Sequence, residues 1–187
     1  MKFSAHFPQV RDRWLQRPVG SAQYRPWLME RGSLTRRLQR HSHAFAVQPL
    51  QQARRKAPHS EAVLLKLLPR QYVLLRDVML RCDGEVAVFA HSVLPRQAMR
   101  GAWRGLGQIG SRSLGGTLFA DPRMCRDALQ YKKLGPQHFL YRRAARYQPG
   151  MTGPIWARRS VFRLGRNAVL VTELFLPEIL ALTEKNR

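Results

Sequence analysis

Apolar and polar positions alternate most clearly between residues 71 and 95. Two runs rich in β-branched and apolar residues flank Asp83 and Gly84 there, the dipeptide that favours a two-residue type I′ turn. Alternation over runs of this length is typical of strands with one face in a core. The pattern therefore predicts an antiparallel β-hairpin whose loop is Asp83 and Gly84.

The position of this loop determines which residues of the hairpin face each other. With Asp83 and Gly84 as the whole loop, Arg76 faces His91, on a side of the hairpin that is otherwise apolar. The prediction depends on register, because a slip of one residue moves every side chain of one strand to the opposite face.

A second hairpin is predicted near the C-terminus. The strand-like runs 155–164 and 168–176 flank a short polar segment, residues 165–167. Glu173 lies in the middle of the last run and shares a face with Val171. A carboxylate between two apolar strand faces loses hydration unless it is paired, hydrogen-bonded or protonated, so Glu173 is a candidate for a special role.

The remaining segments show weaker patterns. Residues 26–40 indicate two short helices broken at Gly32, with Ser33 as the N-cap of the second, and residues 121–134 indicate a helix that begins at Asp121. Three segments are predicted to lack regular secondary structure: a polar loop or frayed helix at 48–60, a glycine-rich loop or flap at 101–119 and a basic loop at 135–154. Together the elements predict one α+β domain, residues 1–187, in which helices pack on a single antiparallel sheet.

Charge limits the kinds of partner. The chain has 33 basic and 11 acidic residues and a formal net charge of +22, and the excess is spread along its length. Such a charge favours anionic partners, whether nucleic acid, a membrane surface or a small acid. Most of the basic residues are arginine, and the planar guanidinium group suits carboxylate and phosphate equally well. Composition alone therefore does not choose among these partners.

The cysteines and the termini indicate a cytoplasmic protein. Cys82 and Cys125 are far apart and belong to no cluster of cysteine and histidine, which disfavours a disulfide framework and a metal site. The N-terminus lacks the apolar core of a signal peptide, and no apolar run approaches the roughly 18–20 residues that cross a membrane.

Three charged or titratable residues are candidates for a binding site, each with an ordinary structural alternative. Glu173 either forms a buried ion pair, with an arginine such as Arg158 or Arg76, or accepts a hydrogen bond from a ligand hydroxyl. Arg76 either pairs with a structural carboxylate or holds the carboxylate of a ligand. His91 either is a half-buried sheet residue or adds a second donor beside Arg76. The residue pattern leaves these alternatives open.

Two further signals are weaker. Residues 105–110 fit the string GxGxxG, but they follow loop sequence rather than a strand, so a dinucleotide site is not predicted. Basic residues and scattered aromatic residues are compatible with nucleic-acid binding, but no zinc finger, aromatic RNA-binding motif or recognition helix accompanies them.

Four segments of the chain resemble the chorismate pyruvate-lyase family, and they occur in the same order as in that family. The last segment, with its ending TELFLP, is the most specific of the four. The segments are residues 27–38, residues 74–95, the stretch around Leu114, and residues 155–177.

The resemblance implies a fold and an activity. The fold is an α+β one, a single antiparallel sheet with helices packed on one side and helical flaps over an internal site. The activity is conversion of chorismate to 4-hydroxybenzoate and pyruvate, the first step of ubiquinone biosynthesis, without a metal or an organic cofactor. The partners are therefore a small-molecule substrate and product, with no specific nucleic acid and no integral membrane segment, and we expect a monomer.

The resemblance also implies roles for individual residues. Arg76 would bind the ring carboxylate and Glu173 the 4-hydroxyl, and both would be catalytic. Leu34 and Leu114 would line the pocket from the flaps. The family has arginine where this chain has His91, so His91 would be a weaker or pH-dependent second contact to the substrate. It has methionine where this chain has Leu34, a mild apolar exchange.

Two other functions remain as alternatives. The same sheet architecture resembles the effector-sensing domains of some bacterial transcription regulators, which would make the protein a non-catalytic module that binds a small acid. The absence of a convincing helix-turn-helix before the first hairpin disfavours this alternative. The second alternative is a basic nucleic-acid-binding protein, whose binding would depend steeply on salt.

Overall fold

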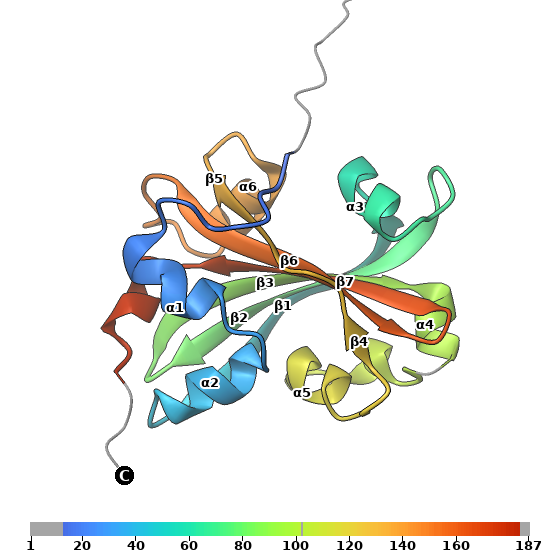
Figure 1. Ribbon diagram of the computed structural model, residues 1–187, viewed down its shortest axis with the longest axis horizontal. Coiled ribbons are helices and arrows are strands. Elements are labelled where there is room, and N and C mark those ends of the chain that lie inside the picture. The colour runs from blue at the N-terminus through green and yellow to red at the C-terminus, as the bar shows by residue number, and fades with distance from the viewer. Residues whose placement is uncertain (1–12, 102, 184–187) are drawn as a thin grey trace, which may run out of the picture.

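The computed structural model describes residues 13–101 and 103–183, and a seven-stranded antiparallel sheet is its central element (Figure 1). The strands lie in the order β1-β2-β3-β7-β6-β4, and β5 also pairs with β6. Their bounds are β1 (Phe45–Lys56), β2 (Tyr72–Cys82), β3 (Glu85–Pro95), β4 (Cys125–Arg126), β5 (Gln130–Leu134), β6 (Ile155–Leu164) and β7 (Asn167–Phe175). The predicted α+β fold with a single antiparallel sheet is confirmed.

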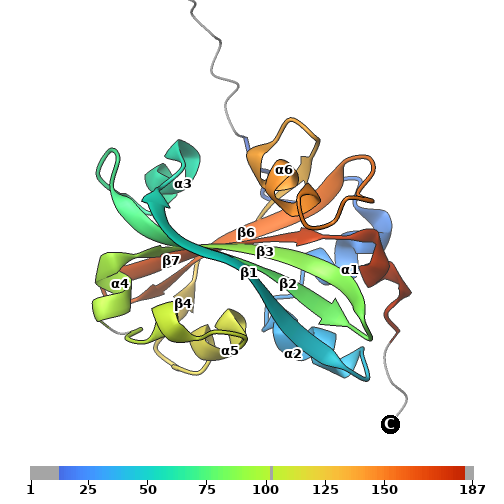
Figure 2. The same cartoon turned by 180° about the vertical axis from the view of Figure 1, so that it is seen from behind.

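Short helices cover both faces of this sheet, so the expectation that helices pack on one side only was wrong. The helices α1, α2 and α5 lie on one face, and α3 and α6 lie on the other (Figures 1 and 2). Their bounds are α1 (Arg25–Leu28), α2 (Leu34–Arg40), α3 (His59–Leu64), α4 (Arg96–Arg100), α5 (Leu114–Leu118) and α6 (Phe139–Ala145), with 3-10 helices η1 (Ala22–Tyr24), η2 (Leu106–Gln108) and η3 (Pro177–Ala181). Within the described ranges, none of these helices is long and apolar enough to cross a membrane.

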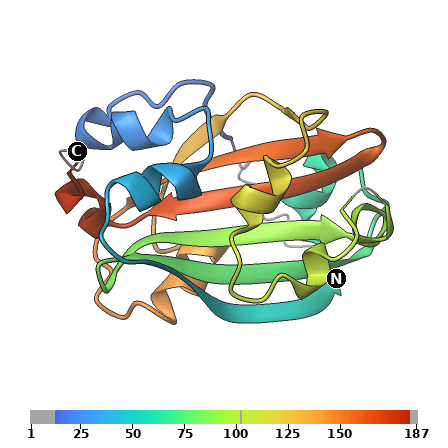
Figure 3. The ribbon, with the colours of Figure 1, turned by 90° about the horizontal axis from the view of Figure 1, so that it is seen from below.

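Two of the helices form flaps over the sheet. Seen from below, α2 and α5 lie across the strands (Figure 3). Each flap begins at a serine that accepts a hydrogen bond from a backbone N–H of its first turn: Ser33 from Arg36, and Ser113 from Gly116. The predicted break at Gly32 and the N-cap at Ser33 are therefore confirmed, and the glycine-rich segment 101–119 contains the second flap.

The C-terminal hairpin is present as predicted. Leu164 pairs with Asn167, so the loop consists of Gly165 and Arg166, and β6 and β7 continue in register to Trp156 and Phe175. Glu173 pairs with Arg158 across the two strands.

The first hairpin has the predicted turn but a different register beyond it. Asp83 and Gly84 both have positive φ, 51° and 89°, as a type I′ turn requires. A bulge then shifts the pairing by one residue, so Arg76 pairs with Ser92 and Asp77 pairs with His91. The predicted pairing of Arg76 with His91 was wrong, and His91 points to the opposite face of the sheet.

The extra residue of the bulge is Ala87, which is skipped in the pairing of β3 with β2. On the other edge of β3, Ala87 stays in register with the next strand. Its carbonyl oxygen accepts a hydrogen bond of 3.0 Å from the backbone N–H of Leu176, just beyond β7.

Three other secondary-structure predictions were wrong. Residues 48–60 were predicted as a polar loop or a frayed helix, but residues 48–56 of this segment belong to β1, an edge strand with many exposed polar side chains. Residues 121–134, predicted as a helix, contain β4 and β5. Asp121 does not cap a helix there; its carboxylate accepts from the backbone N–H of Arg123 at 2.9 Å and closes a turn. Residues 135–154, predicted as a loop, contain α6.

Candidate active site

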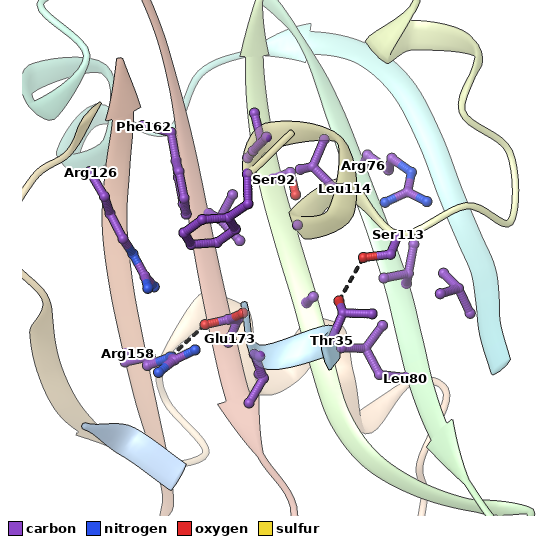
Figure 4. Close-up of a pocket in the computed structure, with 18 of the residues that line it drawn as sticks. Thr35, Arg76, Leu80, Ser92, Ser113, Leu114, Arg126, Arg158, Phe162 and Glu173 are labelled. Atoms are coloured by element: carbon purple, nitrogen blue, oxygen red, sulfur yellow. Dashed lines mark hydrogen bonds and ion pairs between the residues drawn. The ribbon is translucent and has the colours of Figure 1, made fainter. Parts of the chain in front are cut away.

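A closed cavity lies between the sheet and the two flaps. The space open to the centres of water molecules measures about 40 Å³, so the flaps fit closely over it. Its floor consists of side chains from β2, β3, β7 and β6, and its roof consists of residues of α2 and α5 (Figure 4). Arg76, Glu173, Leu34 and Leu114, four of the five residues predicted to bind a ligand, line this cavity together.

Arg76 lines the cavity from β2 and is tied to the segment that leads into α5. Its side chain is buried, and its Nη2 donates hydrogen bonds to the carbonyl oxygens of Gly110, at 2.8 Å, and Arg112, at 3.2 Å. Its Nε and Nη1 donate to no residue in the described part of the chain. Burial lowers the pKa of Arg76, which nonetheless stays cationic at any physiological pH.

Glu173 lies in the cavity and is also part of an ion pair. Arg158 Nε donates to Glu173 Oε2 at 2.6 Å, and the glutamate side chain keeps 14% of its surface exposed. Glu173 and Arg76 do not pair, because β3 lies between their strands and separates them by about 10 Å across the sheet. Glu173 therefore forms the ion pair of the structural alternative, and it also faces a cavity, which the ligand-binding alternative requires.

Two further arginines line the cavity, and one of them is Arg158, which was named from the sequence only as a possible ion-pair partner of Glu173. It is fully buried on β6, and its Nη1 donates to the carbonyl oxygens of Trp27, Leu28 and Glu30, at 3.1, 3.2 and 2.7 Å. Arg158 thus holds the chain that connects α1 to the α2 flap. The available signal was a pair of arginines, Arg158 and Arg159, inside a strand-like run.

Arg126 is the other arginine, and it reaches the cavity from β4. Its Nε donates to Ser160 Oγ at 2.7 Å, and its guanidinium carbon lies 5.0 Å from the ring centre of Phe162. Burial and the nearby charge of Arg158 lower the pKa of Arg126 to about 10, although Glu173 opposes this effect. Arg126 was not among the predicted site residues, because its segment was predicted to be helical.

The cavity lining therefore has an excess of positive charge. Three arginines, Arg76, Arg126 and Arg158, share it with one carboxylate, Glu173. In a low-dielectric cavity, two uncompensated cations are costly unless an anion joins them. The arrangement is suited to a ligand with two negative charges.

The two flaps meet above this lining. Leu34 and Leu114 are both buried and supply apolar contact from α2 and α5. The hydroxyl groups of Thr35 and Ser113 form a hydrogen bond of 2.6 Å that joins the flaps (Figure 4). A ligand larger than a few water molecules therefore requires the flaps to move before it can enter.

His91, the fifth predicted residue, lies away from the cavity. Its Nδ1 is 2.6 Å from Asp77 Oδ1 and its Nε2 is 3.3 Å from Glu61 Oε2, on the face covered by α3 and α6. Arg143 from α6 also donates to Asp77, from its Nε at 3.0 Å. The expectation that His91 contacts the substrate is corrected by this placement, whose cause is the bulge at Ala87.

Comparison with known proteins gives one consistent result. A family model described as chorismate lyase matches residues 13–185. A protein of Methylobacillus flagellatus named "Probable chorismate pyruvate-lyase" is 71% identical over 178 residues, which are 95% of this chain and all of that protein. A protein of Nitrosomonas eutropha with the same name is 44% identical over 167 residues, 89% of this chain and 94% of its own length.

Solved structures show where else the fold occurs. The effector domain of PhnF from Mycobacterium smegmatis has a TM-score of 0.57 at 17% identity, and the match covers 79% of this chain and 90% of that one. The C-terminal domain of a GntR family transcriptional regulator from Bacillus anthracis has a TM-score of 0.50 at 12% identity, and the match covers 71% of this chain and 93% of that one. At such low identity these likenesses concern the fold alone.

The sequence matches, unlike the structural ones, extend to the kind of protein. They show that the chain is an enzyme of the lyase class. It belongs to the chorismate lyase family.

Proposed function

We propose that the protein converts chorismate to 4-hydroxybenzoate and pyruvate in its closed cavity. The observation that carries the proposal is the position of Arg76 and Glu173 at separate places on the lining of one cavity, in a chain of this family. Chorismate has a ring carboxylate and, on the opposite ring carbon, a hydroxyl group. Arg76 binds the carboxylate, and Glu173 accepts a hydrogen bond from the hydroxyl through Oε1, because Arg158 occupies Oε2.

The chemistry needs little beyond positioning and charge stabilisation. The bond between the ring carbon and the ether oxygen breaks, and its electron pair leaves with the enolpyruvyl group. The ring loses the proton of its hydroxyl-bearing carbon, and enolpyruvate takes up a proton to become pyruvate. The ring becomes aromatic, which supplies a large driving force. The protein contributes by holding the substrate in a reactive geometry, excluding water and stabilising the charge on the departing group.

The flaps supply the exclusion of water. Leu34 and Leu114 close over the ring, and the hydrogen bond between Thr35 and Ser113 holds the flaps together. The cavity under the closed flaps has room for little water. The arginines and Glu173 therefore act in surroundings of low dielectric constant, where their electrostatic interactions with a substrate are strongest.

The proposal extends to the cellular setting. The reaction supplies 4-hydroxybenzoate for ubiquinone biosynthesis, and we expect the protein to perform it in the cytoplasm as a monomer, with neither a metal nor an organic cofactor. A regulator-like role is disfavoured because the likeness to effector domains is one of fold, whereas the likeness to lyases extends over the sequence.

A direct assay tests the proposal. Purified protein is incubated with chorismate, and 4-hydroxybenzoate and pyruvate are followed by chromatography and by a coupled dehydrogenase. We expect both products in a ratio of one to one, at a rate far above the spontaneous decay of chorismate. Production of neither above that background would refute the proposed function.

A further inference from the structure

Arg126 and Arg158 do not take part in the proposed binding of the ring carboxylate by Arg76, and Arg158 affects the hydroxyl only by holding Oε2 of Glu173. Both line the cavity, and they lie with Glu173 on the side away from Arg76 (Figure 4). Two cations placed next to each other in a closed cavity repel each other, and a single carboxylate, Glu173, offsets only one of them. Their presence needs a physical reason.

The hydrogen bonds of Arg158 leave one of its nitrogen atoms without a partner. Nε donates to Glu173, and Nη1 donates to three backbone carbonyl oxygens between α1 and α2. Nη2 is buried and has no hydrogen-bond partner among the described residues. A buried guanidinium nitrogen without an acceptor costs free energy comparable to a lost charged hydrogen bond, so a ligand oxygen would gain from binding there.

Arg126 is held next to Arg158 by contacts that fix its direction. Its Nε donates to Ser160, its Nη1 donates to the carbonyl oxygens of Arg31 and Gly32 at 3.2 and 3.4 Å, and its guanidinium group lies over Phe162. No described residue accepts a hydrogen bond from its Nη2. Burial and the charge of Arg158 both lower the pKa of Arg126, as expected for two cations that line the same cavity.

The positions of these groups on the sheet match the connectivity of chorismate. Arg158 pairs directly with Glu173 across β6 and β7, whereas Arg76 is on β2, beyond β3. In chorismate, the carbon that carries the enolpyruvyl ether is bonded directly to the hydroxyl-bearing carbon, whereas one ring carbon separates it from the carbon that carries the carboxylate. A hydroxyl at Glu173 therefore brings the ether side chain next to Arg158 and Arg126.

We propose that Arg126 and Arg158 form a second anion subsite, which binds the carboxylate of the enolpyruvyl side chain. This inference rests on the proposed function and deepens it. The free Nη2 atoms of the two arginines donate to that carboxylate, and their charge also stabilises the electron pair that moves onto the ether oxygen when the carbon–oxygen bond breaks. The subsite needs no additional reactant, because the same two products form.

The subsite makes a prediction about ligands that do not react. An aromatic acid with a second carboxylate at the ether position should bind more tightly than one without it. The probe pair is 3-(carboxymethoxy)-4-hydroxybenzoate and 4-hydroxy-3-methoxybenzoate, which share the ring, the hydroxyl and the ether oxygen and differ in the second carboxylate. We expect the dicarboxylate to bind the wild-type protein at least about 10-fold more tightly, as measured by titration calorimetry at low salt.

Variants of Arg126 test whether this preference comes from the subsite. Arg126→Gln should abolish most of the preference while the affinity for the methoxy compound stays within about 3-fold of wild type. Arg126→Lys, which keeps the charge without the planar fork, should restore part of the preference. Arg123→Gln is the matched control, because its side chain is 79% exposed and pairs with Asp121 at the surface, and it should keep the full preference.

Each outcome decides between the subsite and the function. If wild type binds the methoxy compound but gains nothing from the second carboxylate, or if Arg126→Gln keeps the preference, the subsite is overturned and the proposed function stands. If wild type binds neither probe and does not turn over chorismate, the proposed function fails and the subsite fails with it. If Arg126→Gln does not fold, Arg126→Lys must show a reduced preference relative to Arg123→Gln, and a full preference would overturn the subsite.

Discussion

The two faces of the sheet each bury a cluster of charged side chains, but the clusters differ in balance. On the face covered by α3 and α6, Asp77 and Glu61 surround His91, and Arg143 pairs with Asp77. Two carboxylates meet one guanidinium and one imidazole, which is a neutral set when His91 is protonated. In the cavity, three guanidinium groups meet one carboxylate, and Arg158 Nη2 has no partner among the residues described.

This difference separates a structural network from a binding site. A buried polar cluster whose charges and hydrogen bonds are satisfied within the protein stabilises the fold and has nothing to offer a ligand. A cluster with an uncompensated charge and a free donor needs a partner from outside. Whether the charges and hydrogen bonds of a buried cluster are balanced within the protein therefore indicates the role of the cluster better than the mere presence of charged residues does.

Disruption of the balanced cluster should have the largest effect on stability. Asp77→Asn removes the charge that neutralises His91 and Arg143, so we expect the free energy of unfolding to fall by about 3–5 kcal/mol. Urea denaturation measures this change, and kcat of the folded protein should stay within about 3-fold of wild type. Asp127→Asn is the control, because Asp127 forms an exposed ion pair with Arg163 and should cost at most about 1 kcal/mol.

A stable Asp77→Asn protein with little turnover would contradict these roles of the two clusters, since it would place catalysis on the face covered by α3 and α6, which we regard as structural.

Loss of Arg76 from the cavity should affect catalysis instead. Arg76→Gln removes the cation that we propose binds the ring carboxylate, and we expect kcat/KM to fall by about 10²–10³-fold, with a parallel loss of affinity for 4-hydroxybenzoate. Steady-state kinetics and product titration measure both effects. Arg81→Gln, on the same strand but outside the cavity, should behave like wild type. Near-normal turnover of Arg76→Gln would remove Arg76 from the site.

Titration of His91 should appear in stability and not in binding. Burial alone would lower the pKa of His91, but Glu61 and Asp77 overcome this and raise the pKa to about 9, above its unfolded value near 6.5. Protonation of His91 therefore stabilises the folded protein. This contribution is complete below about pH 6.5 and is lost as the pH rises through about 9.

The comparison of wild type with His91→Gln isolates this contribution from the other titrating groups. We expect the stability difference between the two proteins to shrink by about 2 kcal/mol between pH 6.5 and 9, measured by denaturation at each pH. The affinity of wild type for 4-hydroxybenzoate should not follow the charge of His91 over this range. A difference in stability that is constant with pH would show that His91 does not titrate as described.

The smallest effect should come from the contact between the flaps. Thr35→Val removes the hydroxyl that bonds to Ser113 and keeps the size of the side chain, so the closed state should lose about 0.5–1 kcal/mol. We expect 4-hydroxybenzoate to dissociate about 2–5-fold faster in stopped-flow measurements. Thr117→Val, at an exposed position of α5, is the control. An unchanged dissociation rate would show that the flaps open without breaking this bond.

The same contrast between local and distant constraints explains how far the sequence predicted the fold. The C-terminal hairpin and the break at Gly32 follow from neighbouring residues, and both predictions were confirmed. The register of the first hairpin shifts at Ala87, which is skipped in the pairing with β2 but hydrogen-bonds to Leu176, a residue distant in sequence. The alternation of apolar and polar residues does not mark this bulge, so His91 was assigned to the wrong face.

The site was predictable to a similar extent. Arg76 and Glu173 were found because each interrupts an apolar strand, and a charge in such a place needs an explanation. Arg126 was missed because β4 has only two residues and is defined by its pairing with β6 rather than by its own sequence. Polar β1 was missed for a related reason: an edge strand with exposed side chains lacks the apolar alternation that marks a strand in sequence.

The central claim is that the unbalanced cavity, and not the balanced cluster behind it, binds the ligand. A crystal structure of the protein with 4-hydroxybenzoate tests this claim most directly. We predict a ring under Leu34 and Leu114, with its carboxylate at Arg76 and its hydroxyl at Glu173. A product molecule bound outside the cavity, or in the cavity without contact to Arg76 and Glu173, would contradict the claim.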